Sequence, residues 1–177
     1  MINLSSPYPY YLSKFRVLLI ALGFILFLSG AIFILKQMGI QLLYQSTQSM
    51  PTGLYLQYPA NNYELKDNVV FYPNLKMESL ILKRGWLNIK EPLLKRIIAV
   101  NGNYVCIKDH MLWVNNKKIA PILAHDRKGK TLPYISFCRN LVKNEFWVLG
   151  VSSPYSFDSR YFGVVMKSQI KGKALYL

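Results

Sequence analysis

One stretch of the sequence differs from the rest in its uninterrupted hydrophobicity. Residues 17–35 read VLLIALGFILFLSGAIFIL and carry no charge. As a helix rising about 1.5 Å per residue, this run would span roughly 28 Å, which is close to the thickness of a bilayer core. The residues that follow, Lys36-Gln37-Met38, lack the small residues of a signal-peptide cleavage site. The pattern therefore predicts an uncleaved transmembrane anchor over residues 17–35.

Basic residues on both sides of this run bear on its orientation. Lys14 and Arg16 precede it and Lys36 follows it, whereas no acidic residue occurs before Glu64. Because segments rich in Lys and Arg tend to stay in the cytoplasm, the pair on the N-terminal side favours a cytoplasmic lead over residues 1–16. Residues 36–177 would then form a single domain outside the cytoplasm.

Beyond the anchor, the pattern of apolar and polar residues predicts short strands. Runs rich in β-branched and aromatic residues cover Gly53–Leu56, Asn68–Tyr72, Arg96–Val100, Tyr104–Ile107, Met111–Val114 and Phe146–Leu149. Turn pairs separate several of them, namely Asn101-Gly102, Asp109-His110 and Asn115-Asn116. Residues 75–94 have weak helical spacing and predict a helix or an irregular insert. The expected fold class is mainly β, an antiparallel domain that brings distant residues together.

The net charge bears on the expected partner. The formal charge is +14, from 22 Lys and Arg against 8 Asp and Glu. Anionic lipid headgroups attract basic residues held near the bilayer by about 1 kcal/mol each, and a single-span protein always lies beside lipid. The basic residues are scattered along the chain, without the sustained run or interleaved aromatic motif of a nucleic-acid-binding fold. The sequence therefore predicts anionic membrane lipid as a partner and no nucleic acid.

Cysteine and histidine residues are few. The spacing of Cys106 and Cys138 fits no zinc motif, and His110 and His125 do not supply a second ligand pair. We therefore expect no metal and no cofactor. In an oxidising compartment two cysteines in one small domain can pair, which would stabilise it by roughly 2–4 kcal/mol. Cys106 and Cys138 are accordingly a candidate disulfide.

A polar turn at residues 45–53, QSTQSMPTG, offers the first candidate for chemistry. The proline biases Met50 toward extended geometry and Gly53 permits a tight bend, so the backbone around Ser49 is restricted. A serine hydroxyl held in such a turn can act as a nucleophile. Ser-rich turns are common, however, and most have no catalytic role, so the turn by itself leaves both interpretations open.

A serine nucleophile needs a base. His110 and His125 each lie beside an aspartate in an expected turn, where solvated polar residues are the rule, so a Ser-His-Asp triad is disfavoured. Lys95 lies in the apolar run PLLKRIIAV instead. Free lysine has a pKa near 10.4, and burial among Leu and Ile can lower that pKa enough to give a neutral amine that accepts a proton. The alternative is an amphipathic strand whose lysine reaches out to water.

Four motifs in a fixed order resemble the signal peptidase I family. They are Ser49-Met50-Pro51, residues 67–71 (DNVVF), residues 95–103 (KRIIAVNGN) and residues 156–163 (SFDSRYFG). The likeness is strongest to the TraF-type conjugative transfer peptidases, through SMPTGLY, SFDSRYFG and a cysteine on either side of the second hairpin. It covers nearly the whole chain after the anchor, and the last motif is the most specific. The resemblance implies a signal peptidase-like (LexA/signal peptidase) antiparallel β domain with one N-terminal transmembrane helix.

The resemblance also implies the reacting groups. Ser49 would be the nucleophile, and Lys95 would be the neutral general base that later returns the proton to the leaving amine. The Thr47 hydroxyl and the Ser49 backbone N–H would form the oxyanion hole. Such a donor typically contributes about 3–4 kcal/mol in the transition state.

The last motif would support the lysine. By the same resemblance, Ser156 would orient the lysine amine, and Asp158 and Arg160 would form an ion pair that braces this region. For Ser159 and Tyr161 a plain surface turn remains an alternative.

Two turns depart from the family pattern. The family usually has Gly-Asp before the Val-Val strand, where this chain has Lys66-Asp67-Asn68. It commonly has Pro-Gly-Asp after the lysine strand, where this chain has Asn101-Gly102-Asn103. Both differences fall outside the expected dyad and bear on loop detail only.

By this resemblance the chain is expected to be a membrane-anchored serine endopeptidase with a Ser/Lys dyad and no cofactor. Its partner would be a membrane-inserted precursor, either a pilin-like subunit of a conjugation or type IV secretion system or a substrate bearing a signal peptide. A general type I signal peptidase for exported proteins is one alternative. A catalytically inactive, membrane-tethered assembly factor is another.

Overall fold

The computed structural model describes residues 8–86 and 91–177, without the side chains of residues 8–13, 75 and 76. The chain divides into two compact units, with the boundary between Met38 and Gly39, and each is described by itself. Residues 1–7 of the expected lead lie outside the described residues.

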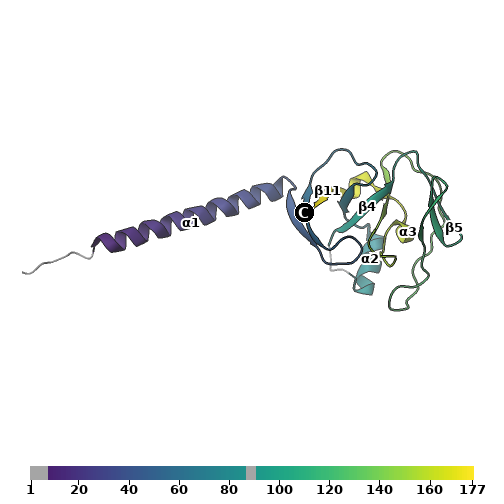
Figure 1. The fold of residues 1–177 in the computed structure, drawn as a ribbon, viewed down its shortest axis with the longest axis horizontal. Coiled ribbons are helices and arrows are strands. Elements are labelled where there is room, and N and C mark those ends of the chain that lie inside the picture. The colour runs from purple at the N-terminus through teal and green to yellow at the C-terminus, as the bar shows by residue number, and fades with distance from the viewer. Residues whose placement is uncertain (1–7, 87–90) are drawn as a thin grey trace, which may run out of the picture. The chain divides into compact units, whose positions relative to one another are not determined.

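The first unit is the helix α1 (Tyr8–Gln37), drawn in purple and blue in Figure 1. It begins within the expected lead, ahead of the apolar run. The segment Lys14–Gln37 is 24 residues long and apolar enough to cross a membrane, and it is not buried in protein. Its large apolar side chains are exposed on all sides. A helix that is hydrophobic all round needs an apolar environment, so α1 suits a lipid bilayer.

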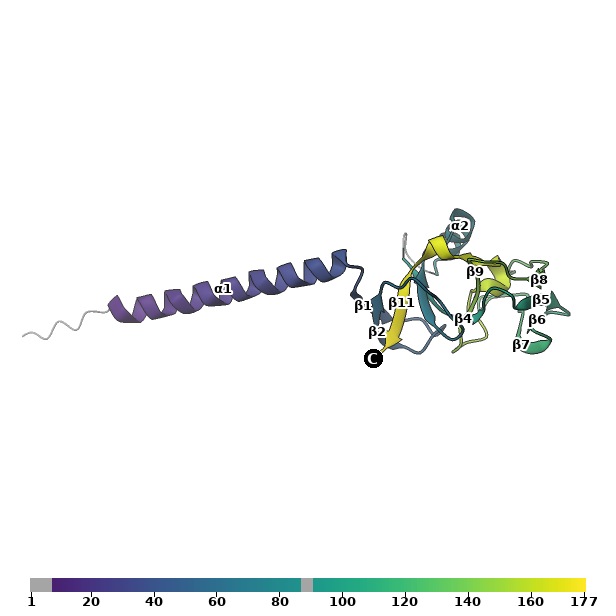
Figure 2. The ribbon, with the colours of Figure 1, turned by 90° about the horizontal axis from the view of Figure 1, so that it is seen from above.

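The second unit, Gly39–Leu177, is built on two antiparallel sheets. Among the described residues, the larger sheet has the strand order β1 (Gln41–Gln45), β2 (Gly53–Tyr58), β11 (Ile170–Tyr176), β3 (Asn68–Phe71), β4 (Leu93–Ala99), β9 (Glu145–Leu149) and β10 (Val165–Met166). The smaller sheet has the order β7 (Lys117–Pro121), β6 (Met111–Val114), β5 (Tyr104–Lys108) and β8 (Cys138–Asn140). Figure 2 shows the smaller sheet at one end of this unit and β1, β2 and β11 at the other. The expected fold class is confirmed.

Three short helices accompany the sheets in the described residues: α2 (Leu75–Arg84), α3 (Ser159–Phe162) and the 3₁₀ turn η1 (Lys167–Gln169). The start of α2 is capped because the Asn74 side chain accepts a hydrogen bond from the Met77 N–H at 3.0 Å. Gly85 ends it in the left-handed conformation with φ of 64°. Within the segment 75–94, where a helix or an insert was expected, residues 75–84 are helical and residues 93 and 94 already belong to β4. Residues 87–90 of that segment lie outside the described residues.

Two of the three expected turns are tight hairpins made by residues with positive φ, whereas Asn101-Gly102 forms a turn that leads from β4 to β5 in the other sheet. Asp109 and His110 have φ of 52° and 53°, and Asn115 and Asn116 have φ of 47° and 64°. Asn and Asp tolerate the left-handed region better than other non-glycine residues, and a pair of such residues closes a two-residue hairpin. These turns set the register of β5, β6 and β7.

The centre of the core lies on β9, whose five residues are all buried. Trp147 and Val148 belong to two different hydrophobic clusters. Because successive side chains in a strand point to opposite faces, β9 contributes to the packing on both sides of its sheet. This strand pairs with β4, which carries Lys95, and so fixes that strand in the interior.

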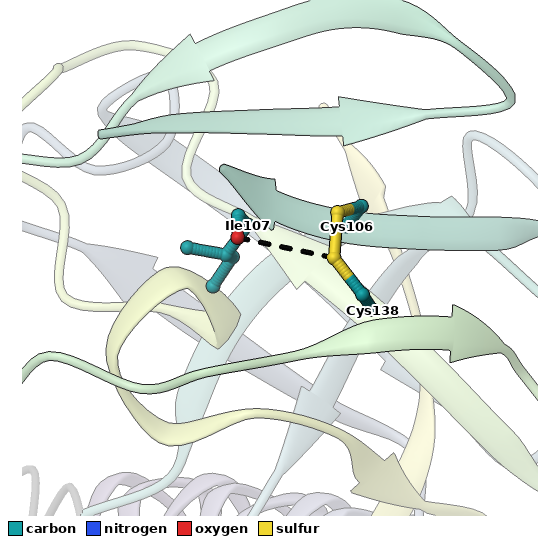
Figure 3. The surroundings of a disulfide bond; sticks show 3 residues. All are labelled: Cys106, Ile107 and Cys138. Carbon is teal, nitrogen blue, oxygen red and sulfur yellow. Dashed lines mark hydrogen bonds between the residues drawn. A yellow bond between two sulfur atoms is a disulfide. The ribbon is translucent and has the colours of Figure 1, made fainter. Parts of the chain in front are cut away.

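Cys106 on β5 and Cys138 on β8 are directly opposite each other in the ladder and are joined by a disulfide. Their Cα atoms are 4.0 Å apart, and the Cys138 sulfur lies 3.9 Å from the Ile107 carbonyl oxygen (Figure 3). The bridge ties β8 to the hairpin of β5 and β6, and so closes the segment that contains the loop between β7 and β8.

Several strands had no clear signal in the sequence, namely β1, β7, β8, β10 and β11. The most consequential is β11, which pairs with both β2 and β3 inside the larger sheet. Its sequence, IKGKALY, contains a glycine and two lysines. Gly172 is needed there because a Cβ atom would overlap the Tyr58 carbonyl group of the neighbouring strand.

Candidate active site

The loop between β1 and β2 holds Ser49 from both sides. The neighbouring Met50 side chain is fully buried and packs in a core cluster with Tyr55. The Tyr55 hydroxyl donates to the Pro51 carbonyl oxygen at 2.9 Å. At the end of the loop Gly53 has φ of 147°, and the Tyr176 ring leaves no room for a Cβ atom there. The hydroxyl of Ser49 is therefore presented from a fixed backbone.

Lys95 extends from β4 to meet this hydroxyl. Its Nζ lies 2.8 Å from the Ser49 Oγ, and its side chain is only 4% exposed. The position of Lys95 in the strand is fixed by antiparallel pairing with Val69 of β3. Sheet pairing thus brings together two residues that are far apart in the sequence, and the alternative of a lysine reaching to water is wrong.

The environment of Lys95 favours the neutral amine. Burial is the largest effect and lowers the pKa of Lys95 from 10.5 to about 8. The nearby Asp158 carboxylate opposes this by raising that pKa, and the Arg160 guanidinium lowers it. A pKa near 8 gives an appreciable fraction of free amine at neutral pH, which suits a general base.

Two polar side chains from the same loop also contact the Ser49 hydroxyl. The Thr47 Oγ1 is 3.1 Å from the Ser49 Oγ, and the Gln45 side-chain amide donates to the Thr47 Oγ1 at 2.6 Å. Gln45 also reaches the Ser49 Oγ itself at 3.4 Å. None of the hydrogen bonds among the described residues uses the Ser49 backbone N–H, which is therefore free to receive an oxyanion. Gln45 was not foreseen from the sequence.

Ser156 is buried close to the nucleophile loop. Its side chain is 4% exposed, and within the described residues its hydroxyl has no hydrogen-bond partner. A Cβ atom on Gly150 would overlap the Ser156 hydroxyl and lie 2.8 Å from the Ser49 carbonyl oxygen. Gly150 is thus the residue that lets the two segments approach, and only the tertiary structure reveals it. A hydrogen bond from Ser156 to Lys95 stays a prediction.

Asp158 and Arg160 form a buried two-point ion pair. Arg160 Nε lies 2.8 Å from one carboxylate oxygen of Asp158, and Nη2 lies 3.0 Å from the other. The two side chains are 0% and 1% exposed. Asp158 also accepts from the Gly150 N–H at 3.0 Å, and Arg160 donates to the Ser156 carbonyl oxygen at 3.0 Å. The carboxylate partner keeps the pKa of Arg160 above its ordinary value.

The flanking residues of this motif are also interior residues. Ser159 is fully buried, and its hydroxyl accepts from the Val148 N–H at 3.0 Å. Tyr161 is buried, and its hydroxyl accepts from the Leu123 N–H at 3.1 Å. The interpretation of these two positions as a surface turn is wrong.

Two hollows among the described residues open onto the Ser49–Lys95 pair. The larger has a volume of about 310 Å³ and reaches toward the loop between β7 and β8. Its walls are mostly apolar or aromatic, with Trp86, Leu93, Leu132, Tyr155, Phe157 and Tyr161. The smaller, of about 250 Å³, runs along β1 and the start of β4. An extended chain could therefore approach the pair through either hollow.

The histidines lie elsewhere. Neither His110 nor His125 lines either hollow, and His110 packs on the Tyr134 ring at 5.8 Å. The described residues contain no cluster of His, Cys, Asp and Glu that could hold a metal ion. The basic chemistry available to Ser49 is that of the lysine.

An apolar anchoring helix, an antiparallel β domain and a buried amine against a serine hydroxyl define a class, the membrane-anchored serine peptidases. The sequence model of the family described as signal peptidase, peptidase S26, matches residues 12–177. The chain belongs to this family.

Two relatives found by sequence, a signal peptidase and a plasmid transfer protein, agree with this assignment. The chain is 32% identical over 90 residues to signal peptidase I V of Bacillus subtilis, a match covering 45% of this chain and 54% of that one. It is 33% identical over 137 residues to the plasmid transfer protein TraF of Escherichia coli, covering 71% of this chain and 76% of TraF. A crystal structure of a signal peptidase I from Enterococcus faecalis aligns with 20% identity and a TM-score of 0.38, over 64% of this chain and 97% of the other.

Proposed function

We propose that this protein is a serine endopeptidase in which Ser49 is the nucleophile and Lys95 the general base, and that it cleaves leader or signal segments from membrane-associated precursors. The observation that carries the proposal is the 2.8 Å contact between the Ser49 hydroxyl and an amine whose pKa is lowered to about 8. Membership of the signal peptidase family supports the same chemistry.

In the reactive state Lys95 is neutral, so the Ser49 hydroxyl donates its hydrogen bond to the amine. The Oγ attacks the scissile carbonyl carbon while its proton passes to Nζ. The resulting ammonium then gives that proton to the leaving amine as the peptide C–N bond breaks. Water, deprotonated by the same lysine, hydrolyses the acyl-enzyme and restores Ser49.

The developing oxyanion would be stabilised by the Ser49 backbone N–H and the Thr47 hydroxyl. Thr47 now lies 3.1 Å from the Ser49 Oγ and can turn toward the carbonyl oxygen as the bond forms. Each such donor typically contributes about 3–4 kcal/mol to the transition state. The otherwise unpaired hydroxyl of Ser156 would accept a hydrogen bond from the Lys95 ammonium or orient the neutral amine.

The anchor and the relatives support a proposal for the location and the substrate. The helix α1 would hold the protein in a bacterial inner membrane, with residues 1–16 in the cytoplasm and the catalytic domain on the periplasmic side, beside anionic lipid. The TraF match covers more of this chain than the signal peptidase I V match does. This favours a specialised substrate, a pilin-like subunit of a conjugation or type IV secretion system, over the whole set of exported proteins.

Substitution of the dyad tests the chemistry. Ser49→Ala and Lys95→Ala should each reduce precursor cleavage in membranes by roughly a thousandfold or more. Lys95→Arg should fail as well, because a guanidinium stays protonated. Lys83→Arg, an exposed change on α2, is the control and should retain full activity. Cleavage by any of the three dyad variants at the native rate would contradict the assignment.

A depletion experiment tests the substrate. Cells are depleted of this protein. Processing of a pilin-like precursor encoded with the conjugation apparatus is then compared with processing of ordinary secretory precursors in the same cells. We expect only the pilin-like precursor to accumulate. Accumulation of both kinds would indicate a general signal peptidase, and accumulation of neither would favour an inactive assembly factor.

A further inference from the structure

The loop between β7 and β8 forms one wall of the larger hollow, and it is fixed in place. Asp126 accepts hydrogen bonds from the backbone N–H groups of Lys128 and Lys130, both at 2.9 Å, which closes the tip of the loop. Arg84 of α2 donates to the Asp126 carboxylate at 2.9 Å and to the Thr131 carbonyl oxygen at 2.6 Å. The loop is thereby tied to α2 and presents a defined surface.

Arg127 extends from this loop to two other segments that line the hollow, the loop that carries Ser49 and the segment that follows β9. Its Nη2 donates to the Gln48 Oε1 at 2.8 Å and to the Ser153 Oγ at 3.2 Å. Its guanidinium carbon lies 5.1 Å from the centre of the Tyr155 ring. Gln48 is the residue before the nucleophile, so the guanidinium is held at the mouth of the hollow, close to where a scissile bond would lie.

The positive charge of Arg127 has no carboxylate partner among the described residues. Both of its hydrogen-bond acceptors are neutral, and they use only one of its nitrogens. Among the described residues that line the hollow, Asp126 is the only acidic one, and it is already engaged by Arg84. Lys128 lines the same wall and adds to the positive charge. The hollow therefore combines aromatic walls with an oriented cation that still has free N–H groups.

We propose that Arg127 is a specificity-determining residue that binds a carboxylate of the precursor next to the scissile bond, while the aromatic walls take an apolar side chain. This inference rests on the proposed function. A guanidinium presents several N–H donors in one plane and matches a carboxylate at two points, which a lysine cannot do. The carboxylate can come from an Asp or Glu side chain or from a nearby chain end.

Peptide cleavage by the full-length protein in detergent tests the inference. The probes are peptides with an Ala-x-Ala cleavage site in which each flanking position in turn is Asp, Asn or Lys. Each peptide ending close to the site is made with a free and with an amidated C-terminus. At one or more positions we expect kcat/KM to be roughly three- to tenfold higher for Asp than for Asn, and lowest for Lys. If kcat/KM rises only for peptides with a free C-terminus, the carboxylate that Arg127 binds is that of a chain end.

Substitutions then connect this preference to Arg127. Arg127→Ala should remove it, and Arg127→Glu should reverse the order so that Lys becomes the better residue. Lys130→Glu changes the net charge by the same amount on the same loop but lies outside the hollow, and it should keep the wild-type order. Thermal unfolding shows which variants are folded, and Arg127→Ala suffices if the charge reversal does not fold.

The outcomes separate the two proposals. If wild-type protein cleaves the peptides without a charge preference, or if Arg127→Ala slows all of them equally, Arg127 does not determine specificity and the inference is overturned. If wild-type protein cleaves no peptide and no membrane precursor, the proposed function itself fails, and this inference fails with it.

Discussion

The Lys95 amine experiences three effects that differ in sign. Burial lowers its pKa, the Asp158 carboxylate raises it and the Arg160 guanidinium lowers it. Because Asp158 and Arg160 neutralise each other at close range, burial dominates and the pKa falls to about 8. Because the two charges of the Asp158–Arg160 ion pair act in opposite directions, the pair as a whole changes the pKa of Lys95 less than burial does.

The pKa of about 8 for Lys95 predicts how the cleavage rate depends on pH. Only the neutral amine can accept the Ser49 proton, so kcat/KM should rise about tenfold per pH unit below pH 8 and level off above it. The measurement is peptide cleavage from pH 6 to 10 with a substrate that does not titrate in this range. A rate that is flat across pH 6–9, or that falls as the pH rises, would argue against a lysine base.

Some residues of the site belong to no recognisable sequence motif, and their roles could not be predicted from the sequence. Ser49 and Lys95 belong to motifs, and their expected proximity agrees with the 2.8 Å contact. Gln45 and Arg127 carry no motif signal, and they act through side chains that meet Ser49 or Gln48 only in the folded domain. The role of Gly150 is visible only in the folded domain, where Ser156 and the Ser49 carbonyl oxygen lie against it.

At the scale of elements, the segment from Gly150 to Gly163 is held in place by a buried polar network. Asp158 caps the first turn of α3 by accepting the Arg160 N–H, and it also accepts the Gly150 N–H. Arg160 donates to the Pro121 carbonyl oxygen at 2.7 Å. This network fastens the segment to β7 and to the end of β9. A buried ion pair adds little net stability, but loss of one partner leaves the other charged and unpaired.

Asp158→Ala should therefore lower the free energy of unfolding by about 3–5 kcal/mol, as measured by urea denaturation. Lys173→Ala, which breaks the more exposed pair with Asp67, is the comparison and should cost about 1 kcal/mol or less. In any folded Asp158→Ala protein, the pH midpoint of cleavage should also shift to lower pH, because a charge that raises the Lys95 pKa is gone. If Asp158→Ala and Lys173→Ala lower the free energy of unfolding by the same amount, the role given to the buried network is wrong.

At the scale of the whole molecule, the two units have different physical requirements. The domain over Gly39–Leu177 contains all the hydrophobic core clusters of the described residues. The helix α1 contributes to none of them and needs an apolar environment of its own. The helix α1 ends at Gln37 and β1 starts at Gln41, so a short connection joins the two units. Tethering enzyme and precursor to one surface raises their effective concentration.

Removal of residues 1–38 should then leave a folded domain that cleaves a short soluble peptide with nearly unchanged kcat/KM. Cleavage of a precursor embedded in vesicles should fall by about a hundredfold, since the advantage of a shared surface is lost. The measurement compares both substrates for the full-length and shortened proteins. A shortened protein that fails equally on both substrates would show that α1 is required for the fold, and one that cleaves both normally would show that the anchor has no role in catalysis.

The sequence by itself determined the apolar helix, the tight turns and most of the strands, and it singled out Ser49 and Lys95 as candidates, because each depends on local pattern, turn chemistry or a contiguous motif. Tertiary structure alone decided the place of β11 between β2 and β3. The need for Gly172 arises only from the close approach of the Tyr58 carbonyl group on the neighbouring strand. Tertiary structure also decided the burial that lowers the pKa of Lys95 and the reach of Arg127 to the mouth of the hollow. Desolvation and long-range contacts are properties of packed surfaces, and no local pattern along the chain encodes them.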